Sequence, residues 1–319
     1  MVTEAHIQKF SEQCKNIFAQ IERDVIGQKE VIEGAVIAMI AGGNVLLEGV
    51  PGVGKTRLIA AVARSIDGSF KRIQFTADVL PSDITGFSVY NQKTGDFEFK
   101  KGAIMSQFVL ADEINRTSPK TQAALLEAME EKQISVDGVT YKMPQPFMVM
   151  ATQNPIEFMG TFPLPEAQLD RFLIKISVGY PDAESERSVL SMHQMDDPFD
   201  TLEAVATTDD IINIQNEVKK VFIHENLESY IISLVSATRN HPSVRLGASP
   251  RASLALYRTA QATAYIDGRD YVIPDDIQKM MVPVMAHRII LSQETKFSNT
   301  TAEDVLEEIK KSTPVPTGK

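Results

Sequence analysis

The sequence has almost no cysteine and no long uninterrupted apolar run. Cys14 is the single cysteine among 319 residues, so no disulfide can form within the chain and a thiolate metal site is not expected. The most apolar stretch, residues 31–50, contains Glu33, Asn44, Glu48 and four glycines, and is too polar for a membrane span. The first ten residues lack the apolar core of a signal peptide. We therefore expect a cytoplasmic protein.

Positive charge is also scarce. The chain has 32 Lys and Arg against 42 Asp and Glu, which gives a formal net charge of −10. A protein that coats nucleic acid needs clustered Lys and Arg, so the balance argues against nucleic acid as the partner, although a ring can be acidic outside and basic in its pore. The length allows one large domain or two smaller ones.

The sequence pattern of the first half predicts a three-layer α/β fold with a parallel sheet. Apolar residues at helical spacing predict helices, and near-continuous apolar runs are typical of parallel strands that are covered on both faces. The expected helices cover residues 4–22, 28–41, 55–66 and 118–131. The expected strands cover residues 44–48, 71–75, 106–111, 146–151 and 172–178. Turn signals predict two inserted hairpins, at residues 87–99 and 134–141.

Beyond Pro181 the pattern becomes helical. The expected helices cover residues 183–194, 209–222, 225–240, 250–266, 274–290 and 301–311. No run in this half predicts a strand of comparable strength. We therefore expect an α/β domain over residues 1–180 and a smaller all-α domain over residues 181–319.

Residues 49–56, Gly-Val-Pro-Gly-Val-Gly-Lys-Thr, fit the pattern G-x-x-x-x-G-K-[ST] between a predicted strand and a predicted helix. Glycines let backbone N–H groups approach phosphate oxygens, and the following helix directs its positive end at them. Lys55 can reach the β- and γ-phosphates, and Thr56 can supply a hydroxyl to Mg²⁺. The residues expected to contact the nucleotide here are Gly49, Pro51, Gly52, Val53, Gly54, Lys55, Thr56 and Arg57.

An acidic pair, Asp112-Glu113, ends the strand predicted at 106–111. Carboxyl ends of parallel strands face the crevice where ligands bind. If this strand neighbours the strand of the phosphate loop, Asp112 would hold Mg²⁺ through its water shell, and Glu113 would activate the attacking water. Solvated acids often end strands, so the interpretation depends on the phosphate loop upstream.

Three further polar residues are candidates for the same site. Asn154 follows a predicted strand and could position the water, or it could simply cap a turn. Arg171 could neutralise the transferring phosphate of a neighbouring subunit, or it could form a local ion pair with Asp170 or Glu166. Arg251 opens a helix, where a cation opposes the dipole; it could reach a phosphate, or it could be solvated.

Longer motifs around these residues are more specific than the phosphate loop alone. With them the chain resembles the MoxR family of AAA+ ATPases from about residue 26 to residue 290. The motifs are Leu-Pro-Ser-Asp-Ile-Thr-Gly at 80–86, Asp-Glu-Ile-Asn-Arg at 112–116, residues 119–131, Pro-Leu-Pro-Glu-Ala-Gln-Leu-Asp-Arg-Phe at 163–172, and Gly-Ala-Ser-Pro-Arg-Ala at 247–252.

The resemblance implies a role for each candidate. Residues 49–56 resemble Walker A, and Asp112-Glu113 resembles Walker B. Asn154 resembles sensor 1, Arg171 the arginine finger and Arg251 sensor 2. The segment that includes Ile26, Gly27 and Gln28 resembles the one that packs on adenine. The two hairpins resemble the helix-2 insert and the pre-sensor-1 hairpin, and the second half resembles the helical lid.

The resemblance also implies an activity and partners. We expect Mg²⁺-dependent hydrolysis of ATP to ADP by a hexameric ring that remodels or assembles a client protein, often with a partner that bears a von Willebrand factor A domain. ATP would bind between sheet and lid at a subunit boundary, and rotation of the lid would move the hairpins. Two alternatives remain open: a nucleotide-gated scaffold with little turnover, and a DNA-acting motor.

Overall fold

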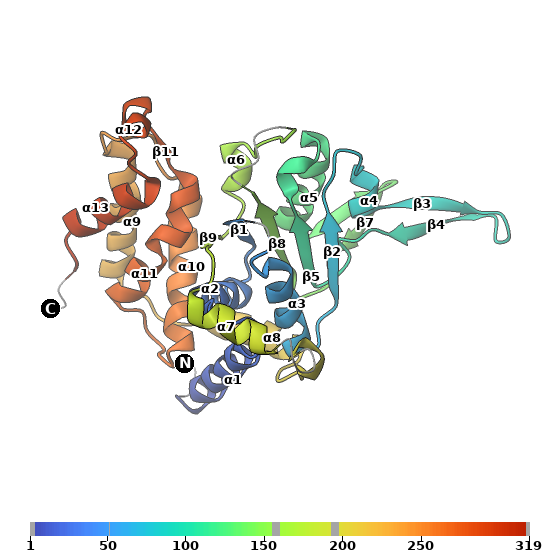
Figure 1. Ribbon diagram of the computed structural model, residues 1–319, viewed down its shortest axis with the longest axis horizontal. Coiled ribbons are helices and arrows are strands. Elements are labelled where there is room, and N and C mark those ends of the chain that lie inside the picture. Colours follow the sequence, from blue (N-terminus) through green and yellow to red (C-terminus); the bar gives the residue numbers. More distant parts are fainter. Residues whose placement is uncertain (1–3, 51, 155–159, 193–197, 317–319) are drawn as a thin grey trace.

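A five-stranded parallel sheet organises the first half of the chain (Figure 1). The computed structural model describes residues 4–50, 52–154, 160–192 and 198–316. The strand order is β2-β5-β8-β1-β9, and every neighbouring pair is parallel. The strands are β1 (Val45–Gly49), β2 (Phe70–Gln74), β5 (Phe108–Asp112), β8 (Met148–Gln153) and β9 (Ile174–Val178).

Helices cover both faces of this sheet, as the apolar strands require. One face is covered by α1 (Glu4–Glu22), α2 (Lys29–Ile40) and α3 (Lys55–Ser65), and the other by α4 (Pro81–Thr85) and α5 (Pro119–Glu131). Alternate residues of β5 point to opposite faces. Phe108 and Leu110 therefore join one hydrophobic cluster, while Val109 and Ala111 join the other.

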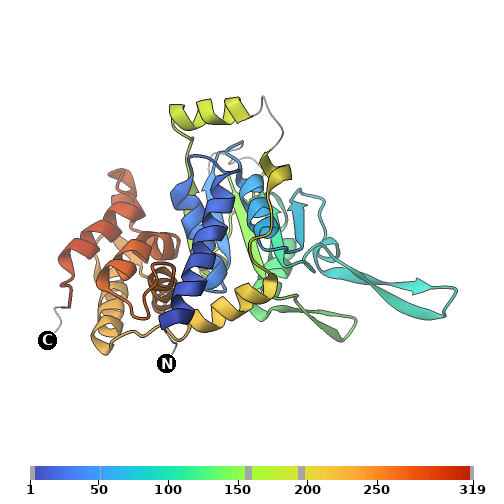
Figure 2. The same cartoon turned by 90° about the horizontal axis from the view of Figure 1, so that it is seen from below.

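The two predicted hairpins are present and project from the sheet domain on the side away from the second half (Figures 1 and 2). The first consists of β3 (Gly86–Asn91) and β4 (Asp96–Lys101), and the second of β6 (Gln133–Val136) and β7 (Val139–Lys142). Phe99 stacks on Tyr141 with ring centroids 4.1 Å apart, so an aromatic contact joins the hairpins at their bases.

The second half is mainly helical. Its helices are α7 (Ala183–Met192), α8 (Thr208–Val218), α9 (Glu225–Asn240), α10 (Pro250–Ile266), α11 (Pro274–Met285), α12 (Gln293–Phe297) and α13 (Ala302–Ser312). A short antiparallel pair, β10 (Val244–Leu246) with β11 (Ile290–Leu291), was not predicted, because runs this short carry no strand signal of their own. The helix expected over 274–290 ends at Met285 and continues as a 3-10 turn and then β11.

The hydrophobic core continues from the sheet domain into the helices of the second half. Buried side chains of α2 and α3 belong to the same cluster as those of α9, α10 and α11, and α10 packs directly against α1 and α2. The two halves therefore share one core. Among the residues that the structure describes, no helix is long and apolar enough to cross a membrane.

A matched pair of substitutions on α9 tests this shared core. Leu234 is fully buried and Ile232 is 59% exposed. We expect Leu234→Ala to lower the free energy of unfolding by about 2–5 kcal/mol, because it leaves a cavity, and Ile232→Ala to change it by less than about 0.5 kcal/mol. Calorimetry should show a single transition that Leu234→Ala moves as a whole. A separate, earlier transition for one half would contradict the shared core.

Candidate nucleotide-binding and catalytic site

The loop between β1 and α3 depends on two glycines with positive φ angles. Gly52 has φ 84° and Gly54 has φ 81°, values that other residues rarely adopt. A Cβ at either position would meet no atom within 4 Å, so the requirement is conformational rather than steric. Gly54 caps α3 without a side chain, and the first amides of that helix can face an anion. Pro51 lies outside the described residues.

Lys55 lies folded back over this loop. Its Nζ donates a hydrogen bond to the carbonyl oxygen of Gly49 at 2.6 Å. Burial lowers the pKa of Lys55, and the negative charges of Asp112 and Glu113 act in the opposite direction. The lysine is thus within electrostatic reach of both acids, and a phosphate group would replace the Gly49 carbonyl as its partner.

The acidic pair lies at the carboxyl edge of the sheet, but β8 separates its strand from β1. The condition that the two strands are direct neighbours is therefore not met, although both end at the same side of the sheet. The intervening strand contributes Thr152, a buried residue whose Oγ1 donates to Asp112 Oδ1 at 2.7 Å. Thr152 Oγ1 also accepts a hydrogen bond from the backbone N–H of Glu113 at 2.8 Å. One hydroxyl thereby fixes both acids relative to β8.

The backbone of Glu113 is strained, and its carboxylate already has two side-chain partners. Its φ angle is 57°, in the left-handed region, which is costly for a residue with a side chain. Its Oε2 accepts a hydrogen bond from Gln74 Nε2 at 2.9 Å and lies 3.2 Å from Arg116 Nε. A carboxylate has about four acceptor sites on its two oxygens, so Glu113 can still accept a proton from water while Gln74 and Arg116 position it.

Mg²⁺ fits the donor set at this edge only together with phosphate. No cluster of three or more His, Cys, Asp or Glu that could hold a metal ion exists in the described part of the chain. Asp112 offers a carboxylate, although Arg72 now pairs with it at 2.5 Å, and Thr56 stands in the first turn of α3. Mg²⁺ commonly binds through one or two carboxylates plus substrate phosphates and keeps several waters.

Asn154 directly follows β8, whose last residue, Gln153, pairs in register with Glu48 of β1. It is buried, with 7% of its surface exposed. This places Asn154 at the same edge as the phosphate loop, where the sequence predicted it.

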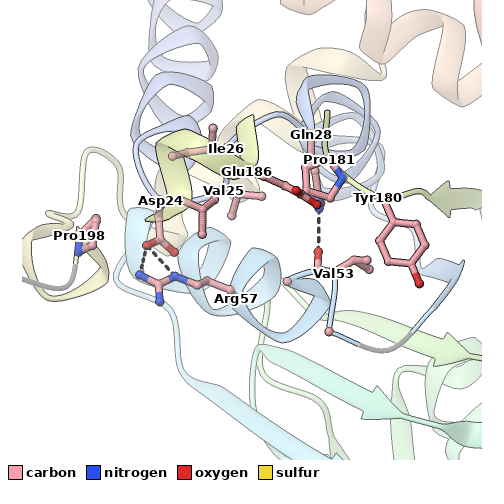
Figure 3. A pocket seen from close by; sticks show the side chains of 13 residues that line it. Asp24, Val25, Ile26, Gln28, Val53, Arg57, Tyr180, Pro181, Glu186 and Pro198 are labelled. Atoms are coloured by element: carbon pink, nitrogen blue, oxygen red, sulfur yellow. Dashed lines mark hydrogen bonds and ion pairs between the residues drawn. The ribbon is translucent and has the colours of Figure 1, made fainter. Parts of the chain in front are cut away.

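A cavity of about 380 Å³ adjoins the phosphate loop (Figure 3). Its walls come from residues 24–28, from the loop and α3, and from residues 180–189 and Pro198. Val25, Ile26 and Val53 make part of the lining apolar, and Gln28 Nε2 donates to the carbonyl oxygen of Val53 at 2.7 Å. The size and mixed lining suit a nucleoside.

Gly27 fixes the roof of this cavity. It has φ 73°, and a Cβ there would lie 2.2 Å from Oγ of Ser185 on α7. Beside it, Arg57 lines the cavity and pairs with the buried Asp24 at 2.5 Å. Arg57 therefore holds the 24–28 segment against α3 in this structure.

Arg171 and Arg251 lie at the opposite side of the sheet, where the strands have their amino ends. In the parallel register Val45 pairs with Ile174 and Gly49 with Val178, so Arg171, just before β9, lies at the amino edge, while the phosphate loop follows the carboxyl edge. Five residues of strand span about 16 Å at roughly 3.3 Å per residue. Neither arginine is placed to serve its own chain's nucleotide.

Both arginines share one carboxylate, that of Glu130. Arg251 Nη2 lies 2.5 Å from Glu130 Oε1, and Arg171 Nε lies 3.1 Å from Glu130 Oε2. The second contact is an ion pair without a directed N–H bond, since Arg171 Nε has no hydrogen-bond partner. The cavity beside the phosphate loop has no lining residue beyond Pro198. Four lining residues of that cavity, Pro181, Glu186, Val189 and Pro198, nevertheless belong to the half expected over residues 181–319, so the candidate nucleotide cavity lies between the sheet domain and the start of that half.

The buried guanidinium of a third arginine, Arg288, connects the loop that carries Arg171 to the helical half. Arg288, with 3% of its side chain exposed, donates to Asp170 Oδ1 at 2.8 Å and to the carbonyl oxygens of Asp170 and Leu173. Ser249, the N-cap of α10, donates to Asp170 Oδ2 at 2.8 Å. Asp170 thus joins the residue before Arg171 to the start of the helix that carries Arg251.

Four residues of this arrangement were missed in the sequence. Gln74 ends β2 and Thr152 is the last residue but one of β8, so the rule that located Asp112 at the carboxyl ends of the strands could have included them. Glu130 and Arg288 carry no such signal, because their partners are distant in sequence: Arg251 in one case and Asp170 in the other.

Comparisons with known proteins agree with the geometry. The family described as "ATPase family associated with various cellular activities (AAA)" matches residues 44–174, and the "AAA lid domain" matches residues 236–309. YeaC of Bacillus subtilis is 53% identical over 93% of this chain and 92% of its own. Chaperone MoxR1 of Mycobacterium tuberculosis is 40% identical over 93% of this chain and 81% of its own.

More distant relatives and a solved structure extend the match. Protein MoxR of Methylorubrum extorquens is 34% identical over 85% of this chain and 86% of its own. A Cytophaga hutchinsonii protein, whose crystal structure was described as that of a candidate ATPase, is 41% identical. It superposes with a TM-score of 0.92, covering 98% of this chain and 97% of that one.

Removing the shared hydroxyl should disturb both acids. We expect Thr152→Val to reduce the rate of ATP hydrolysis by roughly 10–100-fold, as loss of a group that orients a metal ligand usually does, and to raise the Mg²⁺ concentration needed for half-maximal rate. Thr140→Val, on the exposed hairpin strand β7, is the control. Unchanged hydrolysis in Thr152→Val would show that Asp112 and Glu113 need no such support.

Crowding at the roof of the cavity should weaken nucleotide binding. We expect Gly27→Ala to reduce affinity for ATP about tenfold or more, because the added Cβ displaces α7 from the cavity; tenfold corresponds to about 1.4 kcal/mol. Gly95→Ala is the control, since Gly95 has φ 77° but nothing within 4 Å of its Cβ position. Titration calorimetry compares them. Equal affinities in the two variants would mean that contact with α7 does not shape the site.

Proposed function

This chain belongs to the MoxR family of AAA+ ATPases, and from that premise we propose that it hydrolyses ATP with Mg²⁺ at the junction between two copies of itself. Copies would associate head to tail in a ring, of six by the family resemblance. The ring would remodel or assemble a partner protein in the cytoplasm.

The separation of the site into two parts carries this proposal. Lys55, Asp112, Glu113 and Asn154 gather at the carboxyl edge of the sheet, and the paired Arg171 and Arg251 gather at the amino edge. A head-to-tail neighbour can bring the second group to the first. Repeated contacts of this heterologous kind close into rings when the rotation between neighbours closes.

The chain's own residues supply the chemistry in a defined order. The nucleoside enters the cavity beside Gln28, and Lys55 exchanges the Gly49 carbonyl for a phosphate oxygen. Asn154 orients water, and Glu113, positioned by Gln74 and Arg116, accepts the proton of that water. Arg171 and Arg251 of the neighbour stabilise the charge that develops on the transferred phosphate. Mg²⁺, held by Asp112 and Thr56, would neutralise charge on the phosphate oxygens.

The contacts of Asp170 support a specific coupling between subunits. Because Arg288 and Ser249 fix the Arg171 loop to the helical half, a shift of Arg171 and Arg251 toward a neighbour's phosphate would displace the whole helical half with them. We therefore expect the part of the helical half that carries Arg251 and Arg288 to respond to the nucleotide of the adjacent copy.

Work on a client protein is the remaining part of the proposal. A relative that is 40% identical is named a chaperone, which supports remodelling of proteins. The β3–β4 hairpin exposes Tyr90 and Phe97, 53% and 74% respectively, in an edge-to-face pair, and exposed aromatic groups often mark interaction sites. A partner with a von Willebrand factor A domain is proposed from the family resemblance.

Mixing two inactive variants tests the shared site. We expect Glu113→Gln and Arg171→Ala each to lose at least 100-fold in turnover while still binding ATP, because one lacks the base and the other lacks the trans arginine. An equimolar mixture should regain turnover, because Arg171→Ala subunits keep an intact carboxyl edge and Glu113→Gln neighbours supply intact arginines. Phosphate release is the measurement.

Each other outcome has a defined meaning. No recovery in the mixture, although both variants assemble with each other, would place Arg171 outside the neighbour's site. Wild-type turnover as low as that of Glu113→Gln at ring-forming concentration would favour the nucleotide-gated scaffold.

A further inference from the structure

Although the chain is acidic overall, positively charged side chains cluster in one groove. Two adjoining hollows of about 250 and 440 Å³ lie where α5, α8 and α10 meet the turn before β1, and both are lined by Lys132, Leu254 and Arg258. Together we call them the cationic groove. Six cationic and two anionic side chains line it, whereas the whole chain carries a net charge of −10.

Three of these cations have no carboxylate partner in the described part of the chain: Lys132, Lys219 and Arg258. Burial lowers the pKa of Lys132, and the nearby positive charges of Lys219 and Arg258 lower it further. Like charges held close together are unfavourable unless an anion joins them. Leu254, 58% exposed, lies among them.

We propose that the cationic groove receives α7 of a second copy of this chain. The inference rests on the function proposed above, because it takes Arg171 and Arg251 to serve a neighbour's nucleotide. The cavity for that nucleotide has α7 as its roof. On α10, Arg258 lies seven residues beyond Arg251, about 10 Å at 1.5 Å per residue. When Arg251 reaches the neighbour's nucleotide, Arg258 is therefore within reach of the neighbour's α7.

The chemistry of α7 complements the groove. The segment that opens it carries three acids against a single cation, Arg187. Glu186 lines the nucleotide cavity and Asp182 accepts a hydrogen bond from the backbone N–H of Ser185 at 2.8 Å, so Glu184 is the acid that can meet the groove. Glu184 and Glu186 form no ion pair within the described residues. Leu190 is 69% exposed, and α7 is the outermost helix above α2 and α3 (Figure 2). Acidic and apolar groups on one copy thus meet cationic groups and Leu254 on the next.

Charge reversal on each side of the contact tests the surface. Glu184 does not line the nucleotide cavity, and Arg258 does not contact Glu130. With ATP present, we expect Arg258→Glu and Glu184→Lys each to weaken self-association at least tenfold, as measured by sedimentation velocity. Lys311→Glu, on α13, is the control. ATP affinity at concentrations where the chain is monomeric should stay unchanged in all three variants.

The mixture of the two reversed variants gives the sharpest result. In an alternating head-to-tail ring, each groove that carries Arg258→Glu meets a helix that carries Glu184→Lys, and each unaltered groove meets an unaltered helix. Association of the mixture should therefore return to the wild-type level. Wild-type association of the single variants, or a mixture no better than its components, would overturn the α7 assignment while leaving the shared site intact. A wild type that stays monomeric while it hydrolyses ATP would overturn both proposals.

Discussion

The ion pairs of Glu130 with Arg171 and Arg251 hold the two arginines at the amino edge of a sheet whose carboxyl edge carries the phosphate loop. A parallel sheet cannot bring its two edges together, because strand length separates them. In the function proposed here, this arrangement divides one set of catalytic groups between opposite ends of the same chain, and the loop before β9 would serve another molecule's site.

The same constraint determines what the helical half can do. The first helix of this half, α7, lines the nucleotide cavity, whereas α9, α10 and α11 share a core with α2 and α3, and Arg288 binds the backbone around Asp170 from within that core. A buried guanidinium with this many partners would be costly to detach. Movement of the part that carries Arg288 is therefore tied to movement of Arg171, and in the proposed ring this contact would carry communication between nucleotide sites from copy to copy.

Much of this could be predicted from the sequence because local rules apply to it. The phosphate loop has a fixed spacing, and polar residues at the ends of apolar strands mark the ligand-binding edge, which is how Lys55, Asp112, Glu113 and Asn154 were found. Strand order was not accessible, because nothing local shows that β8 lies between β5 and β1. The location of Arg251 was also not accessible, since its partner Glu130 lies 121 residues away.

The dependence of turnover on protein concentration tests the divided site most directly. If each site needs arginines from a second copy, phosphate release per subunit should rise steeply across the concentration range in which copies associate. Nucleotide binding should already be present in the monomer. Turnover per subunit that stays constant from monomer to assembly would contradict the account, because it would show that one chain contains every group that hydrolysis requires.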